Sequence, residues 1–411
     1  MKPCLSRRAL IAGLAASSAA VPAVARAAGK QPAPDLPLVV GSIFPFSGPL
    51  ALVGDEAFRG VTLAVDAING AGGVGGAMVR LLHQDAVASA DAEGAVKALV
   101  AKGAGLILGT GSSALSFAAS AASELANIDF IELDASADAI TTRGFKGLFR
   151  TGLNASLIAD QCLRALTGML LPGWHLALDK LKLVLLFDEG ASDGSFAAAM
   201  LKVCQNAGLP VLLSIGYARD AMDLTAQVGR MKRAAADVVI HAGQPNDVLA
   251  FYQALEAAAW RPRMIIGAGS GYGLGATSYA LGKALEGTMV VAPPLYAAQG
   301  ASASIAAAYM RRYAVPPRGA ESLTCYVGTD LVLRTLDEMG DKAGDKPAAL
   351  PAALAKLNLP AGALANGWGA GFSPAGQNQP VFATTQQWQD GALKTIDVTI
   401  TPHVGAKLSL G

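Results

Sequence analysis

Short apolar runs alternate with amphipathic stretches along most of the chain from Leu38 onward. Apolar runs of about four to eight residues are typical of buried strands, and apolar residues at three- and four-residue spacing indicate one buried helix face. The predicted strands are 38–44, 78–84, 106–108, 128–133, 181–187, 211–215, 237–241, 264–267, 288–292, 382–388 and 393–400. The predicted helices include 56–69, 90–102, 113–126, 157–170, 195–207, 302–313 and 321–339. This alternation predicts an α/β fold with parallel sheets covered by helices.

The series of strands and helices restarts near residue 157, which predicts two lobes. A chain of 411 residues is long for one domain and comfortable for two. Ligands of such folds bind outside the carboxyl ends of the strands. Two lobes whose strand ends face each other would therefore make a binding cleft.

The first 28 residues have the anatomy of a secretory signal. Arg7 and Arg8 precede an apolar stretch at 9–21, and small residues follow at 23–28. A membrane anchor is the alternative, but the apolar run is shorter than the roughly 20 residues that span a bilayer. We expect a periplasmic protein, exported by the twin-arginine route and cleaved so that it starts between Arg26 and Gly29.

Composition excludes several classes of protein. Hydrophobic residues make up 52% of the chain and charged residues 15%, which argues against disorder. Formal net charge is +1, so no basic footprint for nucleic acid exists. Cys162, Cys204 and Cys325 of the mature chain allow at most one disulfide, and free thiols fit equally well. No metal-ligand spacing or cofactor motif occurs, and we expect neither a metal nor a cofactor.

Two serine-containing turns follow predicted strands. The segment GTGSS at 109–113 lies between a strand and a helix, so its amides and the hydroxyls of Ser112 and Ser113 could face a ligand. Ser136 follows the strand 128–133 in the same way. An ordinary helix cap is the alternative at both places.

Several motifs resemble those of the leucine/isoleucine/valine-binding protein family. They are GSIFPFSGPL at 41–50, GDE at 54–56, RG at 59–60, DAIN at 66–69, GGV at 72–74, and the matches within 134–151 that begin with DAS. The resemblance runs over most of 38–403. It implies a type I periplasmic binding fold with two lobes joined by three crossovers. The expected lobes are residues 36–154 with 292–370, and 155–291 with 371–403.

The resemblance also implies a function. Members of this family are non-catalytic solute-binding components of ABC importers, whose cleft closes on small amino acids or other small carboxylates. The expected ligand is a branched-chain or related small amino acid bound in the cleft. The expected partners are this small carboxylate ligand and a membrane permease, with the protein itself a monomer. The family's carboxylate site corresponds to Ser113 and to Ala135–Ser136 in this chain.

This chain departs from the family pattern at the amine end of the ligand. Ser192 stands where amino-acid binders commonly place a Tyr, and Gly269 stands where an acidic residue commonly holds the ammonium. Asp193 could replace that acid, or the ligand could be an amine-free carboxylate such as an aromatic acid. Gln244 occupies a further cleft position, and Val53 and Tyr272 are candidates for the apolar wall.

Parts of the sequence also bear on three other classes of protein. The segment GASDG at 190–194 fits the G-x-S-x-G motif of α/β-hydrolase esterases, with Ser192 as nucleophile, Asp237 or Asp247 as acid and His403 as base. No HGGG-like oxyanion segment precedes it. The glycine-rich stretch 267–275 does not match the dinucleotide fingerprint. An extracellular sensor domain can share the binding fold, but it would normally be followed by a membrane span and a signalling module.

Overall fold

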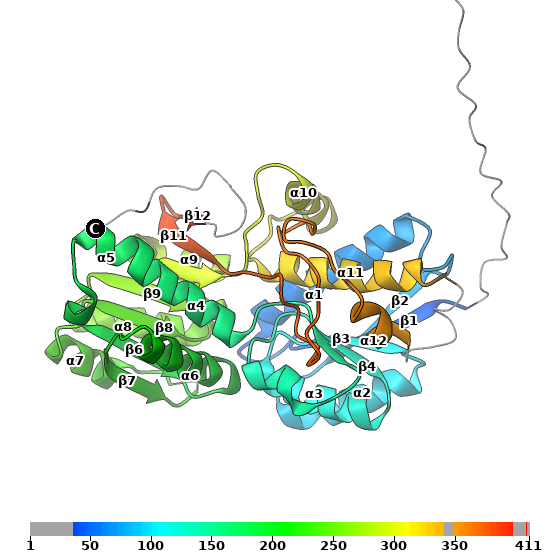
Figure 1. The fold of residues 1–411 in the computed structure, drawn as a ribbon, viewed down its shortest axis with the longest axis horizontal. Helices are drawn as coiled ribbons and strands as arrows, with labels where there is room; N and C mark the ends of the chain where they lie inside the picture. Colours follow the sequence, from blue (N-terminus) through cyan, green and yellow to red (C-terminus); the bar gives the residue numbers. More distant parts are fainter. Residues whose placement is uncertain (1–35, 220, 341–348, 398–407, 409–411) are drawn as a thin grey trace, which may run out of the picture. The chain divides into compact units, whose positions relative to one another are not determined.

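The computed structural model describes residues 36–219, 221–340, 349–397 and 408. The predicted signal at 1–28 and His403 lie outside these residues. The described chain forms two β-sheets, each with helices on both faces (Figure 1). This architecture confirms the predicted α/β class.

The first sheet has five parallel strands in the order β2-β1-β3-β4-β5. Its strands are β1 (Leu38–Phe44), β2 (Val79–Asp85), β3 (Leu106–Gly109), β4 (Asp129–Glu132) and β5 (Leu148–Arg150). The associated helices are α1 (Ala51–Gly70), α2 (Ser89–Ala101), α3 (Ser113–Leu125), α10 (Ala301–Tyr313), α11 (Glu321–Glu338) and α12 (Leu350–Leu354). One core packs α1 and α11 against this sheet, and a second packs α2 and α3 against its other face (Figure 1).

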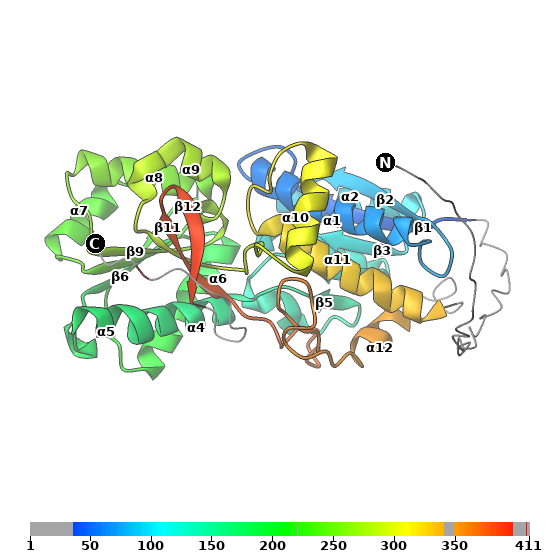
Figure 2. The same cartoon turned by 90° about the horizontal axis from the view of Figure 1, so that it is seen from above.

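The second sheet has seven strands in the order β12-β11-β10-β9-β8-β6-β7. Its strands are β6 (Leu183–Asp188), β7 (Val211–Tyr217), β8 (Val238–Ala242), β9 (Met264–Ala268), β10 (Met289–Ala292), β11 (Thr384–Gln389) and β12 (Ala392–Asp397). Only β11 and β12 run antiparallel to their neighbours. The associated helices are α4 (Ala155–Ala165), α5 (Leu171–Trp174), α6 (Ala191–Asn206), α7 (Thr225–Arg233), α8 (Pro245–Ala257) and α9 (Gly275–Leu281). Figure 2 shows α4 and α5 on one face of this sheet and α7, α8 and α9 on the other.

The chain passes between the two sheets three times. The crossings are residues 151–154 between β5 and α4, residues 293–300 between β10 and α10, and the segment just before β11. Three crossovers are what the family resemblance implies. The lobe boundaries stay a prediction. Gln377, which that prediction assigns to the second lobe, forms a bridge with Arg150 at the end of the first sheet.

Two predicted helices begin earlier than expected. The helix predicted at 56–69 begins at Ala51, because Gly54 lets its first turn lie against the backbone of Pro45; a Cβ at Gly54 would be 1.9 Å from the Pro45 carbonyl oxygen. The helix predicted at 195–207 begins at Ala191. Ser192 and Asp193 therefore lie in the first turn of α6 rather than in the preceding loop.

Other features also differ from the prediction or complete it. The short strand β5 and helix α12 were not predicted, since three and five residues are too few to show a period. Cys162, Cys204 and Cys325 are buried free thiols. Within the described residues, no helix combines the length and the apolar character that a membrane span requires.

Candidate functional site

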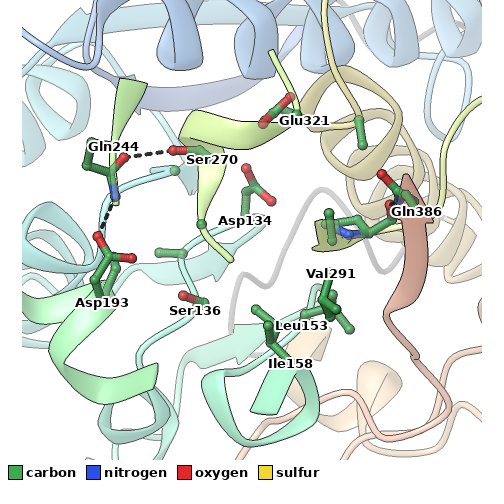
Figure 3. A pocket seen from close by; sticks show the side chains of 18 of the residues that line it. Asp134, Ser136, Leu153, Ile158, Asp193, Gln244, Ser270, Val291, Glu321 and Gln386 are labelled. Atoms are coloured by element: carbon green, nitrogen blue, oxygen red, sulfur yellow. Dashed lines mark hydrogen bonds between the residues drawn. The ribbon is translucent and has the colours of Figure 1, made fainter. Parts of the chain in front are cut away.

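A pocket lies where strands of both sheets end at their carboxyl termini. Its cavity volume is about 90 Å³. The lining residues are Gly111, Asp134, Ala135, Ser136, Leu153, Ile158, Ser192, Asp193, Gln244, Gly269, Ser270, Gly273, Val291, Ala292, Pro293, Leu295, Ala320, Glu321 and Gln386. Figure 3 shows the labelled polar side chains around this space.

Six of the residues predicted from the sequence line this pocket. They are Ala135, Ser136, Ser192, Asp193, Gln244 and Gly269. They follow β4, β6, β8 and β9, so the predicted strand ends meet at one place. Their contact with a ligand stays a prediction.

Asp193 is the best-defined acid of the pocket. It is 3% exposed, and its Oδ2 accepts a hydrogen bond of 2.9 Å from the Gln244 amide (Figure 3). The Gln244 Oε1 accepts in turn from the Ser270 hydroxyl at 2.7 Å. Burial raises the pKa of Asp193 to about 7, against the effect of the Gln244 hydrogen bond.

The Asp193 carboxyl occupies the space beside Gly269. A Cβ at Gly269 would lie 3.2 Å from Asp193 Oδ1, and the Gly269 φ of +92° disfavours any other residue. A side chain at position 269 would thus compete with the Asp193 carboxyl. An acid from the first turn of α6 thus lies beside position 269, and its role as a replacement for the acid expected there stays a prediction.

Ser136 follows β4 of the first sheet and presents free hydrogen-bond donors there, whereas Asp193 follows a strand of the second sheet. Arg150 is fully buried and donates to the carbonyl oxygens of Ala135 and Ala137 at 3.1 and 2.7 Å. Because the N–H and C=O of a trans peptide point in opposite directions, the Ser136 N–H points away from Arg150. Among the described residues, neither this amide nor the Ser136 hydroxyl has a hydrogen-bond partner.

Ser112 and Ser113 are not brought to the pocket. The Ser113 hydroxyl accepts from the Ala137 amide at 3.1 Å and from the Ser192 hydroxyl at 2.7 Å. Ser112 is 4% exposed and its amide donates to Thr110 Oγ1. In this conformation the α3 start supports the 135–137 loop and contacts α6.

Val53 and Tyr272 also lie away from the pocket lining. Val53 is buried in α1. Tyr272 is fully buried, its ring fills the space beside Gly267, and its hydroxyl is 2.6 Å from His241 Nδ1. The apolar part of the lining consists instead of Leu153, Ile158, Val291 and Leu295 and the smaller residues near them.

Sequence reasoning missed four polar residues of the lining: Asp134, Ser270, Glu321 and Gln386. Asp134 follows β4, so the strand-end argument that selected Ser136 could have selected it too. Glu321 begins α11 and Gln386 lies in β11, and neither position carries a local signal. In the described part of the chain, no cluster of His, Cys, Asp or Glu could hold a metal ion.

Two sheets whose strand ends share one polar pocket define a bilobal α/β binding protein. The family model for periplasmic binding proteins matches residues 37–391. The chain is 35% identical over 362 residues to Leu/Ile/Val-binding protein homolog 8 of Brucella abortus, covering 87% of this chain and 89% of that protein. It is 34% identical over 375 residues to homolog 7 of Brucella suis, covering 90% and 93%. The chain therefore belongs to the periplasmic binding protein family.

Solved structures share the fold. The isoleucine complex of the branched-chain amino acid transporter substrate-binding protein LivJ from Streptococcus pneumoniae matches with a TM-score of 0.75 and 19% identity, covering 87% of this chain and 98% of that one. A solute-binding protein of an ABC transporter from R. palustris, in complex with benzoate, matches with a TM-score of 0.72 and 19% identity, covering 91% and 98%. At such identities the matches describe the fold alone.

Proposed function

We propose that this chain is the non-catalytic, extracytoplasmic solute-binding component of an ABC importer and that it binds a small amino acid in the pocket. The family supports this proposal, since its curated relatives are named Leu/Ile/Val-binding protein homologs. The observation that carries the choice of an amino acid is the buried Asp193 carboxyl beside Gly269. An ammonium buried without an acidic partner costs several kcal/mol, and Asp193 supplies that partner.

The carboxylate end of the ligand is assigned to the loop after β4. The Ser136 amide and hydroxyl are free donors, and Gly111 contributes backbone to the same pocket. Arg150 lies behind this loop and adds positive potential without entering the lining. Ser113 acts indirectly, because its hydroxyl holds the Ala137 amide.

The alternatives receive less support. An amine-free carboxylate, like the benzoate of the R. palustris protein, would be placed beside the carboxyl groups of Asp134, Asp193 and Glu321, with no basic side chain in the described lining. An esterase needs a base next to Ser192, whose hydroxyl instead donates to Ser113. His403, the base proposed for that reaction, lies outside the described residues.

A thermal-shift panel tests the proposal. L-amino acids are compared with their matched 2-oxo acids and with benzoate. At about 100 times its dissociation constant, a ligand stabilises the fold by about 2.7 kcal/mol. We expect at least one amino acid to stabilise the protein while its oxo acid does not. Ser136→Ala should weaken the best amino acid, and an oxo acid or benzoate that outperforms every amino acid would overturn the assignment.

A further inference from the structure

The pocket contains more acid than an ordinary amino acid can neutralise. Asp193 accounts for one ammonium, yet Asp134 and Glu321 also line the same space, and no Lys or Arg does so in the described lining. Figure 3 shows the two carboxyl groups on the same side of the pocket. Glu321 is 8% exposed and its Oε2 has no hydrogen-bond partner. An unpaired buried acceptor of this kind costs free energy until a donor reaches it.

Gln386 adds an independent unpaired acceptor. It is fully buried, and its amide nitrogen donates to the carbonyl oxygen of Pro293 and to the Thr384 hydroxyl, each at 2.8 Å. Because the Pro293 carbonyl can only accept, the nitrogen is fixed on that side and Oε1 is directed elsewhere. This Oε1 belongs to a lining residue and has no partner. The pocket therefore has acceptors awaiting donors in addition to Asp193.

The neighbouring Asp134 also opposes the ionisation of Glu321. Burial is the main cause that raises the pKa of Glu321, and the neighbouring Asp134 raises it further. Burial likewise raises the pKa of Asp134, with Glu132 as the second cause. Gly319 leaves the room for the Glu321 carboxyl, since a Cβ there would lie 2.1 Å from Oε2. A positive charge between the two acids would relieve this repulsion.

We propose that Asp134 and Glu321, with Gln386 Oε1 as a further acceptor, form a second cation subsite that binds a positively charged side-chain group of the ligand. The ligand class is then an amino acid whose side chain ends in an amine. The apolar residues Leu153 and Ile158 in the same lining suit the methylene groups of such a side chain. This inference rests on the proposed function and narrows it from small amino acids in general to basic ones.

The test uses two pairs of probes that differ only in the terminal amine: L-lysine with L-norleucine, and L-ornithine with L-norvaline. Titration calorimetry on the full mature protein should give at least about 30-fold tighter binding for the amine-bearing member of one pair. Glu321→Gln should remove most of this preference, because it should weaken lysine binding much more than norleucine binding. Glu338→Gln, at the exposed opposite end of the same helix, is the matched control and should preserve it. Asp134→Asn gives a second variant that does not alter α11.

The outcomes separate the two proposals. If norleucine and norvaline both bind as tightly as their amine-bearing partners, the second cation subsite is wrong and amino-acid binding stands. If 1,5-diaminopentane binds and is lost in Glu321→Gln while no amino acid binds, the subsite stands and the amino-acid assignment is wrong. If only benzoate or a 2-oxo acid binds, both are wrong.

Discussion

At the residue scale, the burial of the Asp193 carboxyl lowers the stability of the ligand-free fold. Burial is the main cause that raises the pKa of this carboxyl, and Asp188 and Asp247 raise it further, whereas the Gln244 amide and Arg219 lower it. The folded chain therefore holds a proton at Asp193 up to a pH of about 7, whereas an unfolded Asp releases it near pH 4. Between these two values the folded state binds more protons than the unfolded state.

We therefore expect Asp193→Asn to stabilise the ligand-free protein in a pH-dependent way. The wild-type contribution to stability falls as pH rises from about 4 to about 7, and it stays low above that. The melting temperature of Asp193→Asn should thus exceed that of the wild type increasingly over this range. Melting curves across the range test the sign, with Asp179→Asn, in an exposed ion pair with Lys180, as a control that stays flat. A difference that shrinks with rising pH would contradict the burial argument.

The same variant should lose its ligand. Asparagine can still accept from Gln244, so the local hydrogen bond survives, but the charge that meets an ammonium does not. We expect the affinity for the best amino acid of the panel to fall by about 2–5 kcal/mol in binding free energy. Calorimetry at pH 8, where the wild-type carboxyl is ionised, measures this loss. Unchanged affinity would remove Asp193 from the site.

At the element scale, the contact between α1 and α11 holds the first lobe together. Gly60 of α1 lies so close to α11 that a Cβ there would be 2.0 Å from the Ser322 carbonyl oxygen. Beside this contact the buried Glu56 carboxylate accepts from Arg318, Tyr309 and Ser322, which ties α1 to the chain before α11 and to α10. The start of α11, where Glu321 lies, is positioned by this network.

Gly60→Ala should therefore destabilise the protein by about 2 kcal/mol or more, because backbone rather than a flexible side chain must move. Gly94→Ala is the matched control, since Gly94 lies in α2 with nothing within 4 Å of an added Cβ. Alanine is the better helix former, so that variant should gain up to about 1 kcal/mol. Urea unfolding of both variants gives the comparison. If Gly60→Ala and Gly94→Ala had the same free energy of unfolding, α1 and α11 would be shown to move apart at little cost.

Elements long enough to show their hydrophobic period could be predicted from the sequence, whereas contacts between elements far apart in the chain could not. The buried strand 38–44 has the bounds that its apolar run predicts, because seven residues suffice to show the pattern. Strand ends after β4, β6, β8 and β9 were correctly expected to meet, since parallel strands share an edge. Glu321 could not be found, because only the packing of α11 on α1 brings it to that edge. Tyr272 resembled a cleft residue in the sequence, but the space left by Gly267 holds its ring in the core.

At the scale of the whole molecule, we expect the two lobes to close on the ligand. Three crossovers join them, and the pocket takes residues from both sheets, so a bound ligand favours the conformation in which both sets of contacts are made. Small-angle scattering should show a smaller radius of gyration with a saturating amino acid than without it. An unchanged radius with ligand bound would contradict hinge closure.

Processing of the N-terminus is a separate prediction for the intact protein. Arg7 and Arg8, followed by the apolar stretch and the small residues, predict export and cleavage. N-terminal sequencing of protein from the periplasm should find a start between Arg26 and Gly29. A cytoplasmic product that retains Met1 would contradict it.

If the proposed importer role holds, the contact of Ser192 with Ser113 bears on how the importer distinguishes ligand-bound from ligand-free protein. Two neutral hydroxyls at 2.7 Å join the start of α6 to the start of α3, and a hydrogen bond of this kind contributes only about 1 kcal/mol. An ion pair in this position would hold the ligand-free protein in the closed conformation. Closed protein without ligand would then occupy the permease without delivering a solute. Because this hydrogen bond is so weak, the bound ligand itself must supply most of the free energy of closure. In the proposed importer, mainly ligand-bound protein would then reach the permease. Replacing both Ser192 and Ser113 by an oppositely charged pair would slow uptake, because ligand-free protein would also occupy the permease.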